Sequence, residues 1–174
     1  ISLEFKRICD ENNINYFIYA VTLLGAVRHK GFIFWDDDID ILMFRDDYEK
    51  FIKIVIDVLL DYYFLQNIYT EKYFYYNYSK IRDCRTIFVE RTDKDININH
   101  GVFIDIFPLD VYPESWLKQK YIKVAERFAN SIIGENYYNF NLNSKKELLI
   151  NKVAIFFQNT KKCGVFLKKN YLKV

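Results

Sequence analysis

The residues best suited to chemistry are four aspartates that lie within five positions of one another, Asp36, Asp37, Asp38 and Asp40. Carboxylates this close repel one another and lose hydration when the fold buries them, so a cation is needed to balance their charge. On a strand, Asp38 and Asp40 would point to one face, about 6.5–7 Å apart along the backbone, while Ile39 and Ile41 would point into the core. This pattern predicts a site for one or two divalent ions.

A further aspartate, Asp105, lies between the apolar residues Ile104 and Ile106 on another predicted strand. Carboxylates on two strands that face each other make an oxygen-ligand site suited to Mg²⁺ or Mn²⁺. A solvated acidic edge or a helix N-cap cluster is the alternative interpretation. An EF-hand calcium loop is excluded, because Ile41 occupies the position of its turn glycine and Asp47 that of its glutamate.

Basic residues accompany the acids in the segment Arg28-His29-Lys30 and at Lys80 and Arg82, which we expect on a strand. Phosphoryl and nucleotidyl transfer need this combination, because Arg and Lys neutralise the charge that grows on the transferred group. Surface ion pairs with the acids are the alternative. Neither histidine lies in a nucleophile motif, and no Walker A or G-x-G-x-x-G loop is present, which argues against serine hydrolases, P-loop ATPases and Rossmann dehydrogenases.

The elements that position these residues follow from the spacing of the apolar side chains. Helical spacing predicts helices over residues 2–13, 46–59 and 114–133, and Thr22 is expected to cap a short helix that ends near Val27. Apolar runs predict strands over residues 14–21, 39–44, 62–68, 73–82, 86–91 and 101–107, the last ending in a turn at Pro108. Because the order lacks regular β-α-β alternation, we expect an α+β fold with a mixed sheet flanked by helices.

The balance of charge divides the 174-residue chain. Residues 144–174 hold eight Lys and one Glu, whereas residues 1–143 are acidic overall, so we expect one globular body over 1–143 and a basic, helical C-terminal arm over 144–174. The arm is typical either of a helix that lies on an anionic membrane or of one that packs against the acidic body. Nucleic-acid binding is disfavoured, because the body is acidic and carries no known motif.

Cellular location is predicted from the cysteines and the apolar runs. Three isolated cysteines without metal-ligand spacing indicate a reducing compartment and no structural zinc site. An uncharged apolar run of about 18 residues is lacking, and the first ten residues carry charges, so we expect neither a transmembrane helix nor a signal peptide. We therefore expect a cytoplasmic protein, at the inner face of the membrane if the arm binds lipid.

Two long blocks carry a family resemblance. The first combines TLLGAVRHKGFI over residues 22–33 with WDDDIDI over 35–41, and the second is GVFIDIFPLD over 101–110. Together they closely resemble the LicD family. The resemblance implies a nucleotidyltransferase-like fold and Mg²⁺-dependent transfer of a phospho-alcohol, typically phosphocholine from CDP-choline, to a cell-surface glycan such as teichoic acid or lipopolysaccharide. Relatives that include fukutin use CDP-ribitol.

The resemblance also implies roles for particular residues. Asp38 and Asp40 match the metal-binding pair, and Asp105 matches the third acid, which is either a ligand or the base that activates the acceptor hydroxyl. The implied nucleotide and phosphate contacts are Thr22, Gly25, Arg28, His29, Lys80 and Arg82.

The chain departs from the usual family pattern at several positions. Val21 replaces a usual glycine, Phe34 replaces a usual proline, and a C-terminal block rich in Pro, Tyr and Gly is missing, which suggests a truncated or degenerate member. Two further interpretations therefore stay open beside the enzyme. One is a non-catalytic paralogue that binds nucleotide or glycan, and the other is a module that binds membrane surfaces through its arm.

Overall fold

The computed structural model describes residues 1–74, 76–123 and 165–167, and the chain divides into two units, residues 1–109 and 110–174. The first unit is built on a mixed sheet in the order β1-β2-β5-β4-β3. Strands β2 and β5 are parallel, and the other neighbours in this order are antiparallel. The strands are β1 (Phe17–Ile18), β2 (Asp40–Phe44), β3 (Tyr63–Gln66), β4 (Ser79–Asp83) and β5 (Val102–Val111). The predicted α+β fold is confirmed.

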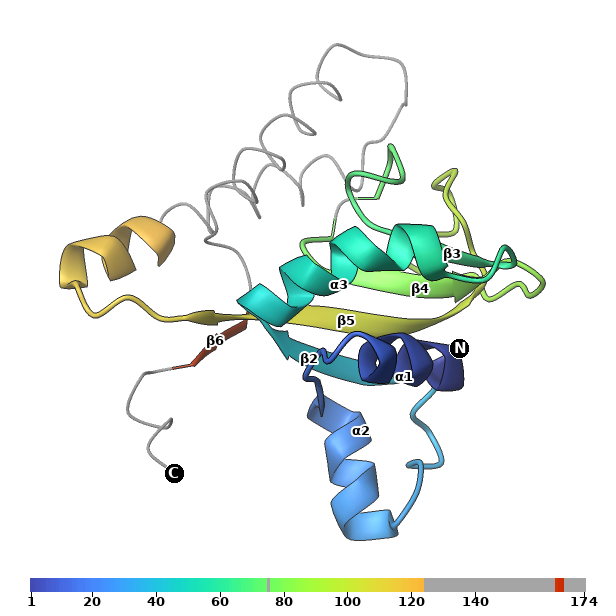
Figure 1. Cartoon of the computed structure of the whole chain (residues 1–174), viewed down its shortest axis with the longest axis horizontal. Coiled ribbons are helices and arrows are strands. Elements are labelled where there is room, and N and C mark those ends of the chain that lie inside the picture. Colours follow the sequence, from blue (N-terminus) through green and yellow to red (C-terminus); the bar gives the residue numbers. More distant parts are fainter. Residues whose placement is uncertain (75, 124–164, 168–174) are drawn as a thin grey trace. The chain divides into compact units, whose positions relative to one another are not determined.

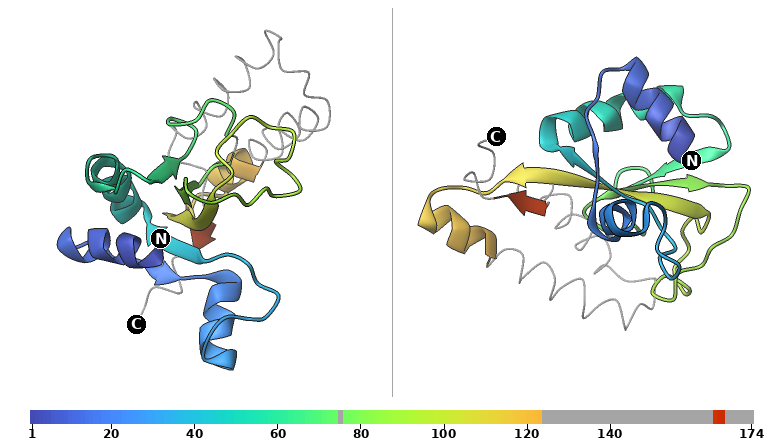
Figure 2. Two further views of the ribbon diagram at one scale, coloured as in Figure 1. Left: turned by 90° about the vertical axis from the view of Figure 1, so that its right-hand side faces the viewer. Right: turned by 90° about the horizontal axis from the view of Figure 1, so that it is seen from below.

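Two helices, α1 (Ser2–Glu11) and α3 (Arg45–Val58), lie on the same side of the sheet (Figures 1 and 2). A third helix, α2 (Ala20–Leu24), continues directly into a π-helical turn, η1 (Gly25–His29), and the two project away from the sheet (Figure 1). π-Helical turns are uncommon and often mark functional sites. Within the described part of the chain, no helix is long and apolar enough to cross a membrane.

The hydrophobic core lies between the sheet and the helices α1 and α3. Helical spacing directs one apolar face of each helix toward the sheet, and the period of two on the strands directs alternate isoleucines toward the helices. The core residues are Phe5, Ile8, Cys9, Ile14, Ile41, Met43, Phe51, Val55, Leu65, Ile81, Ile104 and Ile106. Because Ile104 and Ile106 point into this core, Asp105 between them points to the opposite face of the sheet.

The predicted turn at Pro108 is wrong, because β5 continues through this residue to Val111. Proline cannot donate to a ladder, but β4 pairs with β5 only as far as Ile106. Pro108 pairs with Met43 of β2 on the other side. A proline is tolerated in a strand where one side needs no hydrogen bond.

Four predicted strands are shorter than expected or absent, and one of them is the run 62–68, of which only Tyr63–Gln66 forms β3. The run 14–21 contains only β1, the run 73–82 is a strand only from Ser79, and residues 86–91 form no strand. Residues 86–91 instead belong to an irregular segment between β4 and β5, although their β-branched and aromatic side chains favour a strand.

The second unit is described over residues 110–123 and 165–167. These residues hold the last two residues of β5, a helical segment over residues 116–123, and strand β6 (Val165–Leu167). The helix was expected from 114 to 133, and its continuation beyond 123 lies outside the described residues. At its start, the Gln119 amide donates to the carbonyl of Ser115. The arm is predicted to be helical, but its three described residues form β6, and two of them, Val165 and Phe166, are types that favour strands.

Removal of a core side chain on the far side of Asp105 tests this arrangement. Ile106 is fully buried, so Ile106→Ala should lower the free energy of unfolding by about 2–5 kcal/mol, through lost apolar burial and the cavity left behind. The matched control is Ile56→Ala on the exposed side of α3, where about 0.5 kcal/mol or less is expected. Urea unfolding measures the free energy of unfolding of both variants. Equal decreases would contradict the assignment of Ile106 to the core and of Ile56 to the exposed side of α3.

Candidate active site

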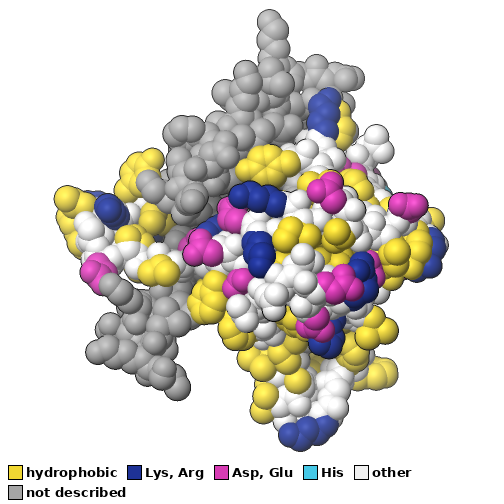
Figure 3. Space-filling model, viewed as in Figure 1, with side chains coloured by type: hydrophobic (Ala, Val, Ile, Leu, Met, Phe, Trp, Pro, Cys, Tyr) yellow, Lys and Arg dark blue, Asp and Glu magenta, His cyan; other side chains and the backbone are white. Residues whose placement is uncertain are grey.

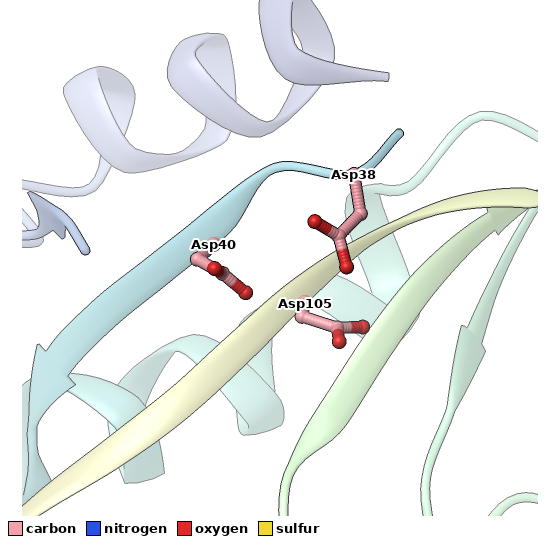
Figure 4. A group of neighbouring side chains, drawn as sticks. All are labelled: Asp38, Asp40 and Asp105. Carbon is pink, nitrogen blue, oxygen red and sulfur yellow. The ribbon is translucent and has the colours of Figure 1, made fainter. Parts of the chain in front are cut away.

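The two central strands bring the predicted acidic residues together. Asp40 opens β2 and pairs directly with Asp105 of β5, so both carboxylates emerge on the same face of the sheet. Asp38 lies two residues before Asp40 and shares its side. One carboxylate oxygen from each of the three residues lies within 4.8 Å of the others, and Figure 4 shows the side chains turned toward a common point. The structure brings these three acids together, and their roles as metal ligands and catalytic residues stay a prediction.

The electrostatics of the three acids fit a cation site. Burial raises the pKa of Asp105 to about 7, although the Lys80 ammonium acts in the opposite direction. Burial, with the charges of Asp38 and Asp36, raises the pKa of Asp40 to about 6. Burial also raises the pKa of Asp38. Among the described residues, Oδ1 of buried Asp105 accepts no hydrogen bond of regular geometry. Oδ1 of Asp105, beside the Lys80 ammonium, therefore has capacity to bind Mg²⁺ or Mn²⁺, which prefer carboxylates.

The start of α2 fixes the position of Asp40. The Asp40 amide donates to Oγ1 of Thr22 over 2.9 Å, and the Tyr19 amide donates to the Asp40 carbonyl over 2.9 Å. The backbone N–H of Val21 donates to the Asp40 carboxylate and holds its pKa down, against the larger effect of burial. Thr22 was expected to cap its helix, but it lies within α2, where Tyr19 is the N-cap residue. Its hydroxyl instead joins the helix to the strand that carries Asp40.

The glycine in η1 is required by close packing of the backbone. A Cβ at Gly25 would lie 2.6 Å from the carbonyl oxygen of Gly31, so the chain after η1 can fold back only against a glycine. Lys30 makes the reversal in the left-handed conformation, with φ of 58°. The structure therefore assigns Gly25 a local packing role, and its implied contact with a nucleotide stays a prediction.

Arg28 and His29 lie at the far end of the projection formed by α2 and η1, away from the sheet (Figure 1). Both are exposed, and the Arg28 Nε donates to Nδ1 of His29 over 3.3 Å. Figure 3 shows hydrophobic side chains along this projection and basic ones at its end. The structure does not bring Arg28 and His29 to the three acids, so their contact with donor phosphates also stays a prediction.

The two basic residues of β4 are buried on the face of the sheet that carries the acids. Lys80 pairs with Asp105 across the strands, and its Nζ lies 3.2 Å from Oδ1 of Asp105. The same ammonium lies 3.4 Å from the centre of the Phe103 ring, a cation–π contact. Lys80 is thus part of the acidic site.

Arg82, two residues along β4, is fully buried and has several partners. Its Nη1 donates to the Gly101 carbonyl over 2.8 Å, and its Nε donates to Oε1 of Gln66. Its Nη2 lies 3.1 Å from Oε2 of Glu90, which also lies 3.0 Å from the Lys80 ammonium. Neither Gln66 nor Glu90 is predicted from the sequence as a partner of these cations. The sequence gives one indication of such a partner. Two cations that are buried on a strand need a carboxylate nearby to balance their charge.

A pocket of about 370 Å³ adjoins the acids. Asp36, Asp37 and Asp38 contribute to its lining, together with the aromatic rings of Phe32 and Phe103. Of the three converging acids, Asp38 lines this pocket, whereas Asp40 and Asp105 do not, so the pocket lies beside the acidic site.

Comparisons with known proteins fit this geometry. The family described as LicD/FKTN/FKRP, nucleotidyltransferase domain, matches residues 13–143. The lipopolysaccharide cholinephosphotransferase LicD of Haemophilus influenzae is 30% identical over 164 residues, which cover 87% of this chain and 57% of that protein. The uncharacterized protein RP689 of Rickettsia prowazekii is 39% identical over 112 residues, 64% of this chain and 38% of that protein. The chain thus spans little more than half of these relatives at most. No solved structure matches it significantly.

The raised pKa of Asp105 predicts how stability depends on pH without metal. Because the folded pKa of about 7 exceeds the usual value of 3.8, the folded state holds the proton more tightly. The free energy of unfolding should therefore fall as the pH rises from about 4 to about 7. Asp105→Asn removes this ionisation and should reduce the fall by on the order of 2 kcal/mol.

Urea unfolding at pH 5 and pH 8 in the presence of a chelator measures this difference. The control is Asp57→Asn at an exposed position of α3, which should keep the wild-type dependence. A wild-type stability that rises over this range, with no change in Asp105→Asn, would contradict the assignment.

Proposed function

Because the chain belongs to the LicD/FKTN/FKRP family, we propose that it transfers a phospho-alcohol from a CDP-activated donor to a hydroxyl of a cell-surface glycan. The observation that carries this proposal is the convergence of Asp38, Asp40 and Asp105 inside the segment that matches the family. Three converging carboxylates, two on adjacent strands and one just before β2, with a lysine beside them, are what a metal-assisted phosphoryl transfer needs.

The choice of donor and acceptor rests on the relative from Haemophilus influenzae, whose name states that it is a lipopolysaccharide cholinephosphotransferase. We propose phosphocholine as the first alcohol to test, with CDP-choline as donor and lipopolysaccharide as acceptor. Phosphoribitol from CDP-ribitol and teichoic acid are the alternatives in the same chemical class. We also propose that the reaction takes place in the cytoplasm, at the inner face of the membrane.

In the proposed reaction, the acceptor oxygen attacks the phosphorus that bears the alcohol, and the bond from this phosphorus to the oxygen of CMP breaks. The carboxylates of Asp38, Asp40 and Asp105 would hold Mg²⁺ or Mn²⁺. When bound, the ion would neutralise negative charge on the pyrophosphate of the donor. Lys80, which lies beside Asp105, is placed to add positive charge next to the transferred group.

The proton of the acceptor hydroxyl must go to a base. Asp105 can take this role only where Asp38 and Asp40 hold the ion without it, so metal ligand and base are alternative roles for Asp105. CMP leaves with the electrons of the broken bond. Thr22 holds Asp40 in place through the Asp40 amide, which keeps the acids aligned during the reaction.

Substitution of either acid in the first block tests the metal assignment. Asp38→Asn and Asp40→Asn should each lower transfer of phosphocholine at least 100-fold, because each removes a charged ligand. Neither variant should unfold, since both positions are only partly buried and lose mutual repulsion. The control is Asp46→Asn, at an exposed position in the first turn of α3. Full activity of either site variant would refute the assignment.

Thermal shift with nucleotides separates the enzyme from a non-catalytic paralogue. A ligand that binds only the folded state raises the melting temperature, so CDP-choline or CDP-ribitol at millimolar concentration should do so. The increase should require Mg²⁺, because the acids repel the donor phosphates until a cation balances them. CMP alone serves as the comparison. No response to either CDP-alcohol with Mg²⁺ present would favour the non-catalytic interpretation.

A further inference from the structure

Glu90, which is partly buried, lies at the centre of a chain of charges on the face of the sheet that carries the acids. Its Oε2 lies 3.0 Å from the Lys80 ammonium and 3.1 Å from Nη2 of Arg82. Lys80 in turn lies 3.2 Å from Oδ1 of Asp105. Charges therefore alternate from Arg82 through Glu90 and Lys80 to Asp105.

The two cations cannot be buried without a carboxylate partner. Lys80 is 1% exposed and Arg82 is 0% exposed, and a buried charge without a counter-charge is strongly destabilising. The other two partners of Arg82, Gln66 and the carbonyl of Gly101, are neutral. Among the described residues, Glu90 is thus the only carboxylate within ion-pair distance of Arg82, and it shares Lys80 with Asp105.

The segment between β4 and β5 holds Glu90 in this position. A turn follows Glu90, in which the Asp93 amide donates to the Glu90 carbonyl over 2.9 Å. Just before it, the Phe88 amide donates to the His100 carbonyl, and the Phe88 ring lies 5.9 Å from that of Phe103. An irregular segment is therefore fixed at both sides of the residue that contacts the cations.

The charge of the group depends on Glu90. When all are ionised, the four carboxylates of Asp38, Asp40, Asp105 and Glu90 exceed the two cations by two negative charges, which one divalent ion balances. Without Glu90, the excess is one. The nearest remaining carboxylate for the Lys80 ammonium is then Asp105, so Lys80 would compete with a metal ion for that oxygen.

We propose that Glu90 is a positioning residue of the metal site, which holds Lys80 in place and leaves Asp105 free to bind a divalent ion. This inference rests on the proposed function, because it assumes that the three aspartates bind a metal. Partners of metal ligands commonly change metal affinity 10- to 100-fold when they are mutated.

The experiment compares Mn²⁺ binding by the full chain and by three variants, measured by calorimetry with Mn²⁺ alone. Glu90→Gln should weaken binding about tenfold, and Glu90→Asp, which keeps the charge, should restore most of the affinity. The matched control is Glu71→Gln. Glu71 belongs to the same polar network. Its Oε1 accepts from the Asn99 amide over 2.7 Å and its Oε2 accepts from Gln66, and it forms no ion pair with Lys80 or Arg82 in the described part of the chain. The affinity of the Glu71→Gln variant for Mn²⁺ should stay within about twofold of wild type.

The melting temperature of each variant is measured beside its affinity. Wild-type affinity in Glu90→Gln would overturn the inference. So would equal weakening in Glu90→Gln and Glu71→Gln together with equal losses of melting temperature, because that result reports a structural role only. If the wild-type chain itself binds no Mn²⁺, the metal site fails and the inference fails with it, a result distinct from the first two.

Discussion

The structure depends on one constraint, the burial of like charges on a sheet whose other face is the hydrophobic core. The parallel register of β2 and β5 places Asp40 opposite Asp105, and the same register places Ile41 opposite Ile106. A shift of one residue would move the isoleucines out of the core and the acids into it. The burial of the isoleucines therefore fixes where the carboxylates lie. Core and site are the two faces of the same pair of strands.

The remaining elements follow from the charge that this register concentrates. β4 lies beside β5 and contributes Lys80 and Arg82 on the face of the acids, with Lys80 directly opposite Asp105. Two buried cations then require a further carboxylate, which the irregular segment between β4 and β5 supplies as Glu90. On the other side of β2, the start of α2 binds the backbone of Asp40 through Thr22. Each polar contact stabilises the position of a charge that the fold has already buried.

The sequence predicted the parts of this arrangement that depend on local periodicity. Alternation of Ile and Asp around residues 39–41 and 104–106 predicted both strands and the face on which each side chain lies. Successive side chains on a strand point to opposite faces of the sheet, so the isoleucines and the aspartates separate. The end of β5 was not predictable from Pro108, since the tolerance of a proline depends on which neighbour pairs with it. The role of Glu90 was equally hidden, because its segment has no periodic pattern and its partners lie on another element. Contacts between distant segments were accessible only from the fold.

The acidic site lowers the stability of the folded protein, because the fold buries carboxylates close together. Burial raises the pKa of Asp40 to about 6 and that of Asp105 to about 7, which means that the folded protein resists their ionisation. An apolar or amide side chain at either position would remove this cost. The single lysine beside Asp105 relieves only part of it, because one ammonium is shared with Glu90. A cluster that served only to stabilise the fold would carry matched charges, whereas an excess of negative charge on buried strands is what a bound divalent cation would balance.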